Sequence, residues 1–277
     1  MRALIAVATA LAFAFAQPAH AEPLLFHNGR LFVDARVNGI PTEALLDSGA
    51  EATLIDPALA AKAKLPEGTP QQIRGSGGTA NARIVEGATV EALDVTLHPE
   101  AVVVMDLGEL SRRLIKRPTP MVLGRELFDA ARLRIDIGHG TIETLDDESR
   151  PSGVALPLTA HAGIESIPVS IGGTPAQAEF DLGNGSGPLI SRALVKRLRL
   201  RPVTRQAGGG IGGPLMRDVV VIPRLTVAGV LFRNVRASVD DQPNANDVNI
   251  GTSILKEFVI ATDFKSRRVW LQPMRRK

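Results

Sequence analysis

Hydrophobic positions along this chain fall mostly in short alternating runs, and turn residues separate the runs about every ten positions. This spacing is typical of an all-β protein, in which each strand buries one face. Residues 30 to 37 alternate in this way and lead into Asn38-Gly39, a strong hairpin signal, after which residues 43 to 47 return as a second strand. We therefore predict a fold built mainly from hairpins and short strands.

Two short helices are expected between the strands. Residues 57 to 65 predict the first, with Asp56 as its N-cap and Pro57 at the first helical position. Residues 192 to 200 predict the second, with Ser191 as its cap. Each half of the chain is expected to close with a pair of strands, within residues 133 to 145 and 259 to 271.

The second half of the chain repeats landmarks of the first half in the same order. Aligning the two halves on the acid of each pairs Gly39 with Gly173, Pro41 with Pro175 and Asp47 with Asp181. Further along, the matching positions are Gly75, Gly77 and Gly78 with Gly210, Gly212 and Gly213, Leu123-Gly124 with Ile250-Gly251, and Asp136 with Asp263. A period of half the chain indicates two copies of one domain rather than a solenoid.

The stretch from Thr42 to Asp56 contains the main candidate for chemistry. It reads T-E-A-L-L-D-S-G-A-E-A-T-L-I-D, so that two apolar strands meet at Asp47-Ser48-Gly49-Ala50. This arrangement places the Asp47 carboxylate at a tight turn, where backbone N–H groups and the Ser48 hydroxyl can orient it. The alternative is a plain hairpin turn, since Asp, Ser and Gly are all good turn residues. The repeat in the second half favours the functional interpretation.

The motif order resembles a retropepsin-like aspartic protease unit. The residues that carry this likeness are D-S-G-A at Asp47, the glycine-rich G-S-G-G at Gly75, and Val122-Leu123-Gly124. Two such units in tandem are similar to the bacterial exported aspartyl protease family. The resemblance implies an all-β, bilobal acid-protease-like fold with short helices, in which two retropepsin-like β-barrel domains are related by a pseudo-twofold axis. We place these domains at residues 22–150 and 151–277, with the polar segment 146–153 as the linker.

The resemblance also implies a catalytic mechanism. Asp47 and Asp181 would form the catalytic pair and share one proton, because two adjacent carboxylates cannot both ionise easily. They would activate a water for peptide-bond hydrolysis, with no cofactor and no metal, while an extended peptide or protein substrate lies under two flaps. The expected supporting residues are Ser48, Gly49, Ala50, Leu182, Gly183 and Asn184, and the expected flap residues are Gly75, Ser76, Gly77, Gly78, Gly210, Ile211, Gly212 and Gly213.

The second half departs from the family pattern in two ways. Leu182 stands where the family has Thr or Ser, so it cannot supply the hydroxyl that links the two active-site loops. The step from Asp181 to Leu189 is also one residue longer than the step from Asp47 to Leu54. A noncatalytic peptide- or protein-binding module is therefore the alternative function. Pairing of Asp47 with its counterpart in another molecule is a third interpretation, which the second domain disfavours.

Composition excludes several other classes of protein. The chain has no cysteine, which rules out thiol nucleophiles, thiolate metal sites and disulfides. Its histidines show no H-E-x-x-H or similar ligand pair, so no metal is expected. Residues 208–213 match G-x-G-x-x-G, but no helix is predicted after them, which argues against a nucleotide loop. The net charge of +3 is too small to indicate nucleic acid as the main partner.

The beginning of the chain is predicted to direct export. Residues 1–21 contain Arg2, an apolar run and the A-x-A cleavage pattern Ala19-His20-Ala21, as in a secretory signal peptide. An uncleaved anchor is the alternative, but the apolar run is shorter than the roughly 20 residues that a spanning helix needs. We expect a secreted or periplasmic protein with no integral membrane segment after cleavage. The internal repeat suggests a monomer that contains its own pseudo-dimer.

Overall fold

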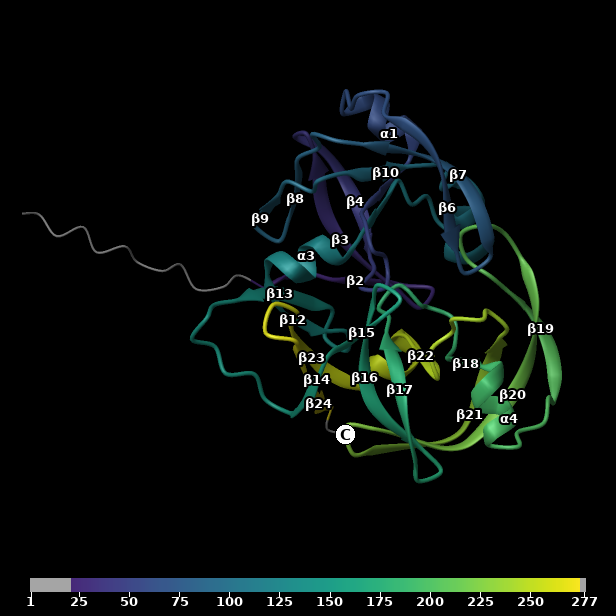
Figure 1. Cartoon of the computed structure of the whole chain (residues 1–277). Helices are drawn as coiled ribbons and strands as arrows, with labels where there is room; N and C mark the ends of the chain where they lie inside the picture. The colour runs from purple at the N-terminus through teal and green to yellow at the C-terminus, as the bar shows by residue number, and fades with distance from the viewer. Residues whose placement is uncertain (1–20, 275–277) are drawn as a thin grey trace, which may run out of the picture.

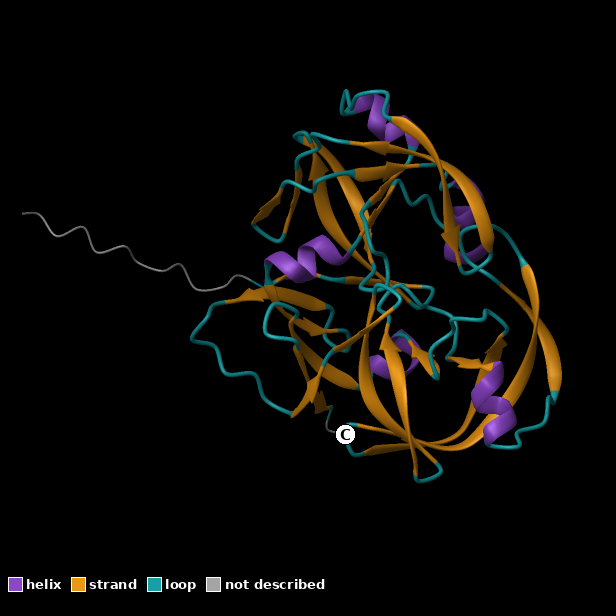
Figure 2. Ribbon diagram, in the orientation of Figure 1, coloured by secondary structure: helices purple, strands orange, loops and turns teal. Residues whose placement is uncertain are grey.

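The computed structural model describes residues 21–274, so the predicted signal peptide lies almost entirely outside the described residues. These residues form three β-sheets with a few short helices (Figures 1 and 2). The all-β prediction is confirmed. No helix in this part of the chain is long and apolar enough to cross a membrane.

The first half of the chain builds a ten-stranded sheet, which lies at the top of Figure 1. The predicted hairpin at Asn38-Gly39 is present, with φ values of 48° and 77° at its two central residues, as such a turn requires. The strands are β2 Leu25–His27, β3 Arg30–Val37, β4 Ile40–Leu46, β5 Leu54–Ile55, β6 Thr69–Gly75, β7 Gly78–Val85, β8 Val90–Ala92, β9 Val95–Leu97, β10 Val102–Val104 and β11 Met121–Leu123.

The second half builds an eight-stranded sheet in the lower part of Figure 1. Its strands are β15 Thr159–His161, β16 Ile164–Ile171, β17 Thr174–Phe180, β18 Leu189–Ser191, β19 Thr204–Gly208, β20 Leu215–Val227, β21 Val230–Asp240 and β22 Val248–Ile250. The order of strand pairing repeats that of the first half. In each half, the strand that precedes the aspartate pairs in parallel with a late strand, β4 with β11 and β17 with β22.

The third sheet combines strands from both halves. It contains β1 Glu22–Pro23, β12 Arg132–Asp136, β13 Thr141–Leu145, β14 Val154–Pro157, β23 Phe258–Asp263 and β24 Arg268–Pro273. The two predicted closing strand pairs are β12 with β13 and β23 with β24, and β12 pairs with β23 to join them. Residues 146–153 connect β13 to β14 within this shared sheet.

Both predicted helices are present and begin where expected. Helix α1 spans Pro57–Lys62, and its N-cap Asp56 accepts a hydrogen bond from the Ala58 N–H at 3.0 Å. Helix α4 spans Arg192–Arg197, and the Ser191 hydroxyl accepts from the Leu194 N–H at 3.2 Å. Each ends a few residues earlier than predicted. The sequence analysis did not anticipate four further helical segments: α2 Gly108–Leu110, η1 Ser111–Ile115, α3 Arg125–Ala130 and α5 Thr252–Leu255.

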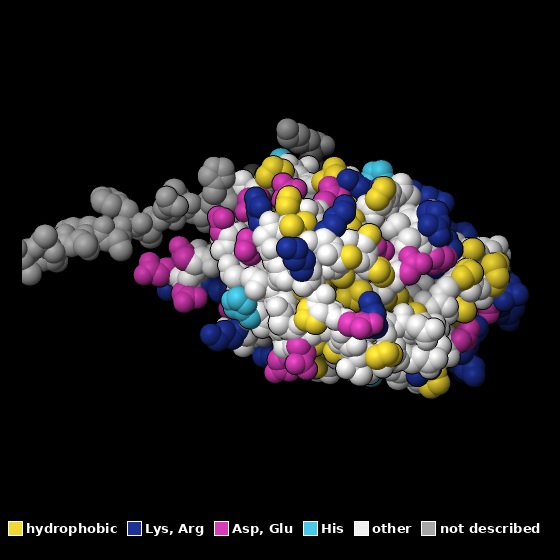
Figure 3. All heavy atoms as spheres, turned by 90° about the horizontal axis from the view of Figure 1, so that it is seen from above, with side chains coloured by type: hydrophobic (Ala, Val, Ile, Leu, Met, Phe, Trp, Pro, Cys, Tyr) yellow, Lys and Arg dark blue, Asp and Glu magenta, His cyan; other side chains and the backbone are white. Residues whose placement is uncertain are grey.

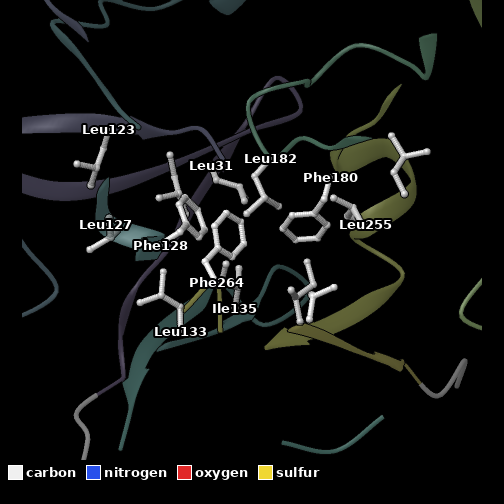
Figure 4. Close-up of a cluster of buried hydrophobic side chains, with 14 of the residues drawn as sticks. Leu31, Leu123, Leu127, Phe128, Leu133, Ile135, Phe180, Leu182, Leu255 and Phe264 are labelled. Carbon is white, nitrogen blue, oxygen red and sulfur yellow. The ribbon is translucent and has the colours of Figure 1, made fainter. Parts of the chain in front are cut away.

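The main hydrophobic core runs continuously through both halves of the chain. Figure 4 shows its centre, where Leu182 lies among Leu31, Phe180 and Phe264. The Phe264 ring stacks on the Phe128 ring with 5.2 Å between centroids. Leu182 has no solvent exposure. The residue that departs from the family pattern therefore contributes to the packing between the two halves.

Charged side chains are distributed over the surface in both signs. On the face shown in Figure 3, lysines and arginines are interspersed with aspartates and glutamates. Many of these groups form ion pairs, such as Arg192 with Asp218 and Asp241.

Candidate active site

Asp47 and Asp181 each follow directly after a strand, β4 and β17 respectively, and each is held by the same type of backbone contact. The Asp47 N–H donates to the Leu123 carbonyl at 3.0 Å, and the Asp181 N–H donates to the Ile250 carbonyl at 3.1 Å. Each carboxylate also accepts a hydrogen bond from the turn that follows it. These donors are the Gly49 N–H to Asp47 Oδ1, at 2.9 Å, and the Asn184 N–H to Asp181 Oδ1, at 3.0 Å.

The two turns pack against each other so closely that each contacts the carboxyl group of the other. A Cβ at Gly183 would lie 2.2 Å from Asp47 Oδ2, and a Cβ at Gly49 would lie 3.0 Å from Asp181 Oδ1. Any side chain at Gly183 would therefore collide with the Asp47 carboxyl. The glycine in each turn leaves room for the two acids to face each other.

The environment of the pair favours one shared proton. Burial, followed by the nearby Asp181 carboxylate, raises the pKa of Asp47 to about 7. Burial also raises the pKa of Asp181, although hydrogen bonds from Asn249 and from the backbone of Asn184 and Gly183 oppose this shift. The extra donors stabilise the ionised form of Asp181. The two carboxyls therefore titrate as one coupled pair that shares a proton.

The Ser48 hydroxyl links the two turns. It donates to the Phe180 carbonyl at 2.8 Å and accepts from the Leu182 N–H at 3.0 Å. Ser48 is buried, so both hydrogen bonds are shielded from water. Leu182 has no hydroxyl to return this contact. One half of a symmetric link is therefore present, and the other half is replaced by apolar packing.

Comparison with models of known protein families identifies the family to which the chain belongs. The family model described as aspartyl protease matches residues 33–127 and 167–254, which together exceed half of the chain. The chain belongs to the aspartyl protease family. The two separate matches confirm the prediction of two tandem retropepsin-like units. A comparison with curated proteins found no match.

Within this protease fold, the Asp181 side of the pair carries two polar residues that the sequence analysis missed. Asn249 Nδ2 donates to Asp181 Oδ2 at 2.7 Å and to Glu179 Oε2 at 2.9 Å. The Asn249 side-chain oxygen accepts in turn from Asn184 Nδ2 at 2.7 Å. Glu179 stands two residues before Asp181, and the period of two along a strand could have suggested that both point the same way. Only the pairing of β22 with β17 reveals Asn249.

A buried arginine also lies beside the carboxyl pair. Arg30 is only 6% exposed, and its Nη1 donates to the carbonyls of Asn28 and Leu114 at 3.0 and 3.2 Å. Burial lowers its pKa, while the charges of Asp47 and Asp181 raise it. Its positive charge therefore helps the pair to retain one negative charge.

The two predicted flap segments meet at their tips. The first is the turn Gly75 to Gly78 between β6 and β7, and the second lies in the loop between β19 and β20 (Figure 1). The Gly77 N–H donates to the Ile211 carbonyl at 2.8 Å. A Cβ at Gly77 would lie 2.2 Å from the Gly213 carbonyl oxygen, a Cβ at Gly210 would lie 2.4 Å from Ser76 Oγ, and a Cβ at Gly212 would lie 2.4 Å from the Gly78 nitrogen. Glycine is needed at this crossing because the backbones touch.

Two arginines hold the flap tips together from opposite halves. Arg113, from η1, donates to the carbonyls of Gly209 and Gly210 in the second flap at 2.8 and 3.0 Å. Arg217, from β20, donates to the Ser76 carbonyl in the first flap at 2.9 Å. Neither contact was predicted from the sequence, because each depends on how the two halves dock.

A pocket of about 630 Å³ lies against η1, and its lining includes Asp56, Arg112 and Lys116 but neither Asp47 nor Asp181. Within residues 21–274, no cluster of three or more His, Cys, Asp or Glu side chains is placed to hold a metal ion.

Proposed function

We propose that this protein is an aspartic endopeptidase in which Asp47 and Asp181 hydrolyse peptide bonds. The observation that carries this proposal is the facing pair of carboxyls, each oriented by backbone N–H groups and enclosed by the opposite turn. This arrangement supports general acid and general base catalysis from two groups of one residue type, because adjacent carboxyls that share one proton offer one proton donor and one proton acceptor.

The asymmetry of the pair suggests which acid does which step. Asp181, which accepts three hydrogen bonds from Asn249, Asn184 and Gly183, serves as the general base and takes a proton from the attacking water. Asp47, protonated, donates its proton to the carbonyl oxygen of the scissile bond. The water oxygen bonds to the carbonyl carbon, and the proton on Asp181 passes to the leaving amine as the tetrahedral intermediate collapses. In the same collapse a hydroxyl proton of the intermediate passes back to Asp47, so both acids return to the starting state without a covalent intermediate.

The flaps and the predicted signal peptide indicate how a peptide would bind and where the protein would act. An extended peptide would lie between the carboxyl pair and the flap tips. The Gly77 N–H and the Ile211 carbonyl bond to each other while the flaps meet, and both would be free to bond to the peptide backbone once the flaps part. The predicted signal peptide supports action in the periplasm or outside the cell. We propose a monomeric enzyme, since one chain supplies both acids.

A noncatalytic binding module is the second candidate, and one observation favours it. Leu182 removes half of the hydrogen-bonded link between the two turns, and the Ser48 hydroxyl supplies the half that remains. A binding protein would tolerate this loss more easily than an enzyme.

Cleavage of a mixed peptide library by the mature protein between pH 3 and 7.5 decides between them. Asp47→Asn and Asp181→Asn are tested in parallel, with circular dichroism to show that each variant is folded. We expect cleavage by the wild type and its loss in both variants. Loss in Asp47→Asn alone would point to an asymmetric site or to pairing between molecules. Absence of cleavage by the folded wild type at every pH would leave the binding module as the function.

A further inference from the structure

Glu179 occupies a position beside the carboxyl pair that the proposed reaction does not use. It precedes Asp181 by two residues at the end of β17, and successive side chains on a strand alternate between faces. Its neighbours Ala178 and Phe180 are fully buried in the core, whereas Glu179 is half-buried on the opposite face. Asn249 bridges the two carboxylates with one amide nitrogen. Glu179 therefore lies immediately next to the Asp181 carboxylate.

The equivalent position in the first half is apolar. Leu45 stands two residues before Asp47 and pairs in register with Val122, as Glu179 pairs with Asn249. Leu45 and Val122 belong to an apolar cluster separate from the main core, and Ile211 of the second flap packs against this cluster. The two sides of the carboxyl pair thus differ in chemistry. One is lined by leucine and valine, and the other by glutamate and asparagine.

Glu179 has no cationic partner among the described residues. Its side-chain hydrogen bond comes from the neutral amide of Asn249, and no arginine, lysine or histidine lies within ion-pair distance. The charged groups that act on it are Asp181 and Asp240, which repel its charge, and His161, which attracts it. Asp240 itself pairs with Arg217 at 3.1 Å. A partly buried carboxylate without a counter-ion is unfavourable, so a cation brought by a ligand would be stabilised there.

We propose that Glu179 is a specificity-determining residue that selects a lysine or arginine side chain of an extended peptide next to the scissile bond. The basic side chain would lie on the Asp181 side, and an apolar side chain would lie on the opposite side against the cluster that contains Leu45. The inference rests on the proposed function for the position of the peptide, but not on turnover. The expected substrates are peptides in which an apolar residue and a basic residue stand next to each other at the scissile bond.

Binding to the Asp47→Asn variant tests this inference without requiring cleavage. Fluorescence anisotropy at pH 7.5 compares labelled octapeptides with a central Leu-Arg, Arg-Leu, Leu-Leu or Leu-Glu pair. We expect the better of the two arginine peptides to bind on the order of tenfold more tightly than the Leu-Leu peptide, and the Leu-Glu peptide to bind most weakly. Adding Glu179→Gln, which keeps an oxygen for Asn249, should abolish the preference for arginine. Adding Glu179→Leu, which introduces the residue found at the equivalent position Leu45, should make the Leu-Leu peptide the tightest binder.

Glu100→Gln is the matched control, since it removes one negative charge from an exposed residue between β9 and β10. It should leave the ranking of peptides unchanged. Equal affinity for arginine and leucine peptides, a preference that survives Glu179→Gln, or no binding of any peptide would overturn the inference. Cleavage without preference for basic peptides would refute the role of Glu179 alone. An arginine preference in binding with no cleavage by the wild type would refute the endopeptidase and leave the specificity of the cleft standing.

Discussion

Replacing Ser48 with alanine should destabilise the protein by breaking a buried link between the two turns. The Ser48 hydroxyl joins the turns that carry Asp47 and Asp181 through the Phe180 carbonyl, at 2.8 Å, and the Leu182 N–H, at 3.0 Å. Ser48 is 3% exposed, so water cannot readily take the place of its hydroxyl as a hydrogen-bond partner. Leaving a buried donor or acceptor unpaired costs about 1 to 3 kcal/mol each. Two such groups lose their partner, so we expect Ser48→Ala to lower the free energy of unfolding by about 2 to 6 kcal/mol.

Equilibrium unfolding in urea at pH 5 measures this change, followed by circular dichroism and tryptophan fluorescence. Ser186→Ala is the control, because Ser186 is exposed and its hydrogen bond to the Asn184 side chain comes from its backbone N–H, which alanine retains. It should stay within about 0.5 kcal/mol of the wild type. Ser48→Thr keeps the hydroxyl and should recover most of the loss.

This reasoning would be refuted if Ser48→Ala were as stable as Ser186→Ala and its unfolding free energy changed with urea concentration at the same slope. That result would mean that apolar packing around Leu182 holds the two turns together without the hydroxyl. A destabilised variant that still cleaves peptides at the wild-type rate would separate the stability of the link from the geometry of the acids.

Three further predictions concern the same turns. Gly183→Ala places a Cβ within 2.4 Å of the Asp47 carboxyl atoms, so kcat should fall by on the order of 100-fold, whereas Gly187→Ala, whose nearest contact is 3.8 Å away, should keep most activity in the same peptide assay. Leu182→Thr restores the family pattern but puts a hydroxyl into a fully buried apolar site, and urea unfolding should show a loss of about 2 kcal/mol rather than a gain. Because the folded state raises the pKa of Asp47 to about 7, the stability that its protonated form contributes is complete below about pH 4 and is lost as the pH rises through 7. Asp47→Asn should therefore melt at a higher temperature than the wild type at pH 8, and this advantage should shrink at pH 4; an equal difference at both pH values would contradict the assigned pKa direction.

Local chemistry explains which features could be predicted from the sequence. Asn38-Gly39 specifies its hairpin because both residues accept positive φ, and Asp56 caps α1 because its carboxylate reaches the free N–H of Ala58. The repeated order of acid, glycine-rich segment and hydrophobic-Gly pair was sufficient to predict two related units and the two acids. These signals involve residues close in sequence, or a motif that occurs twice.

Contacts between distant segments could not be predicted in this way. The sequence marked Leu182 as a defect in the link between turns, whereas the fold uses it as core between the halves, opposite Leu31 and Phe264. It also could not reveal that Asn249 would join Glu179 to Asp181, since that contact requires β22 to pair with β17 in one register. The sequence by itself determined the repeat, the hairpins, the helix caps and the identity of the two acids. Only the tertiary structure decided which neighbours surround each acid, because strand register and the docking of the two halves bring together side chains that lie more than 60 residues apart.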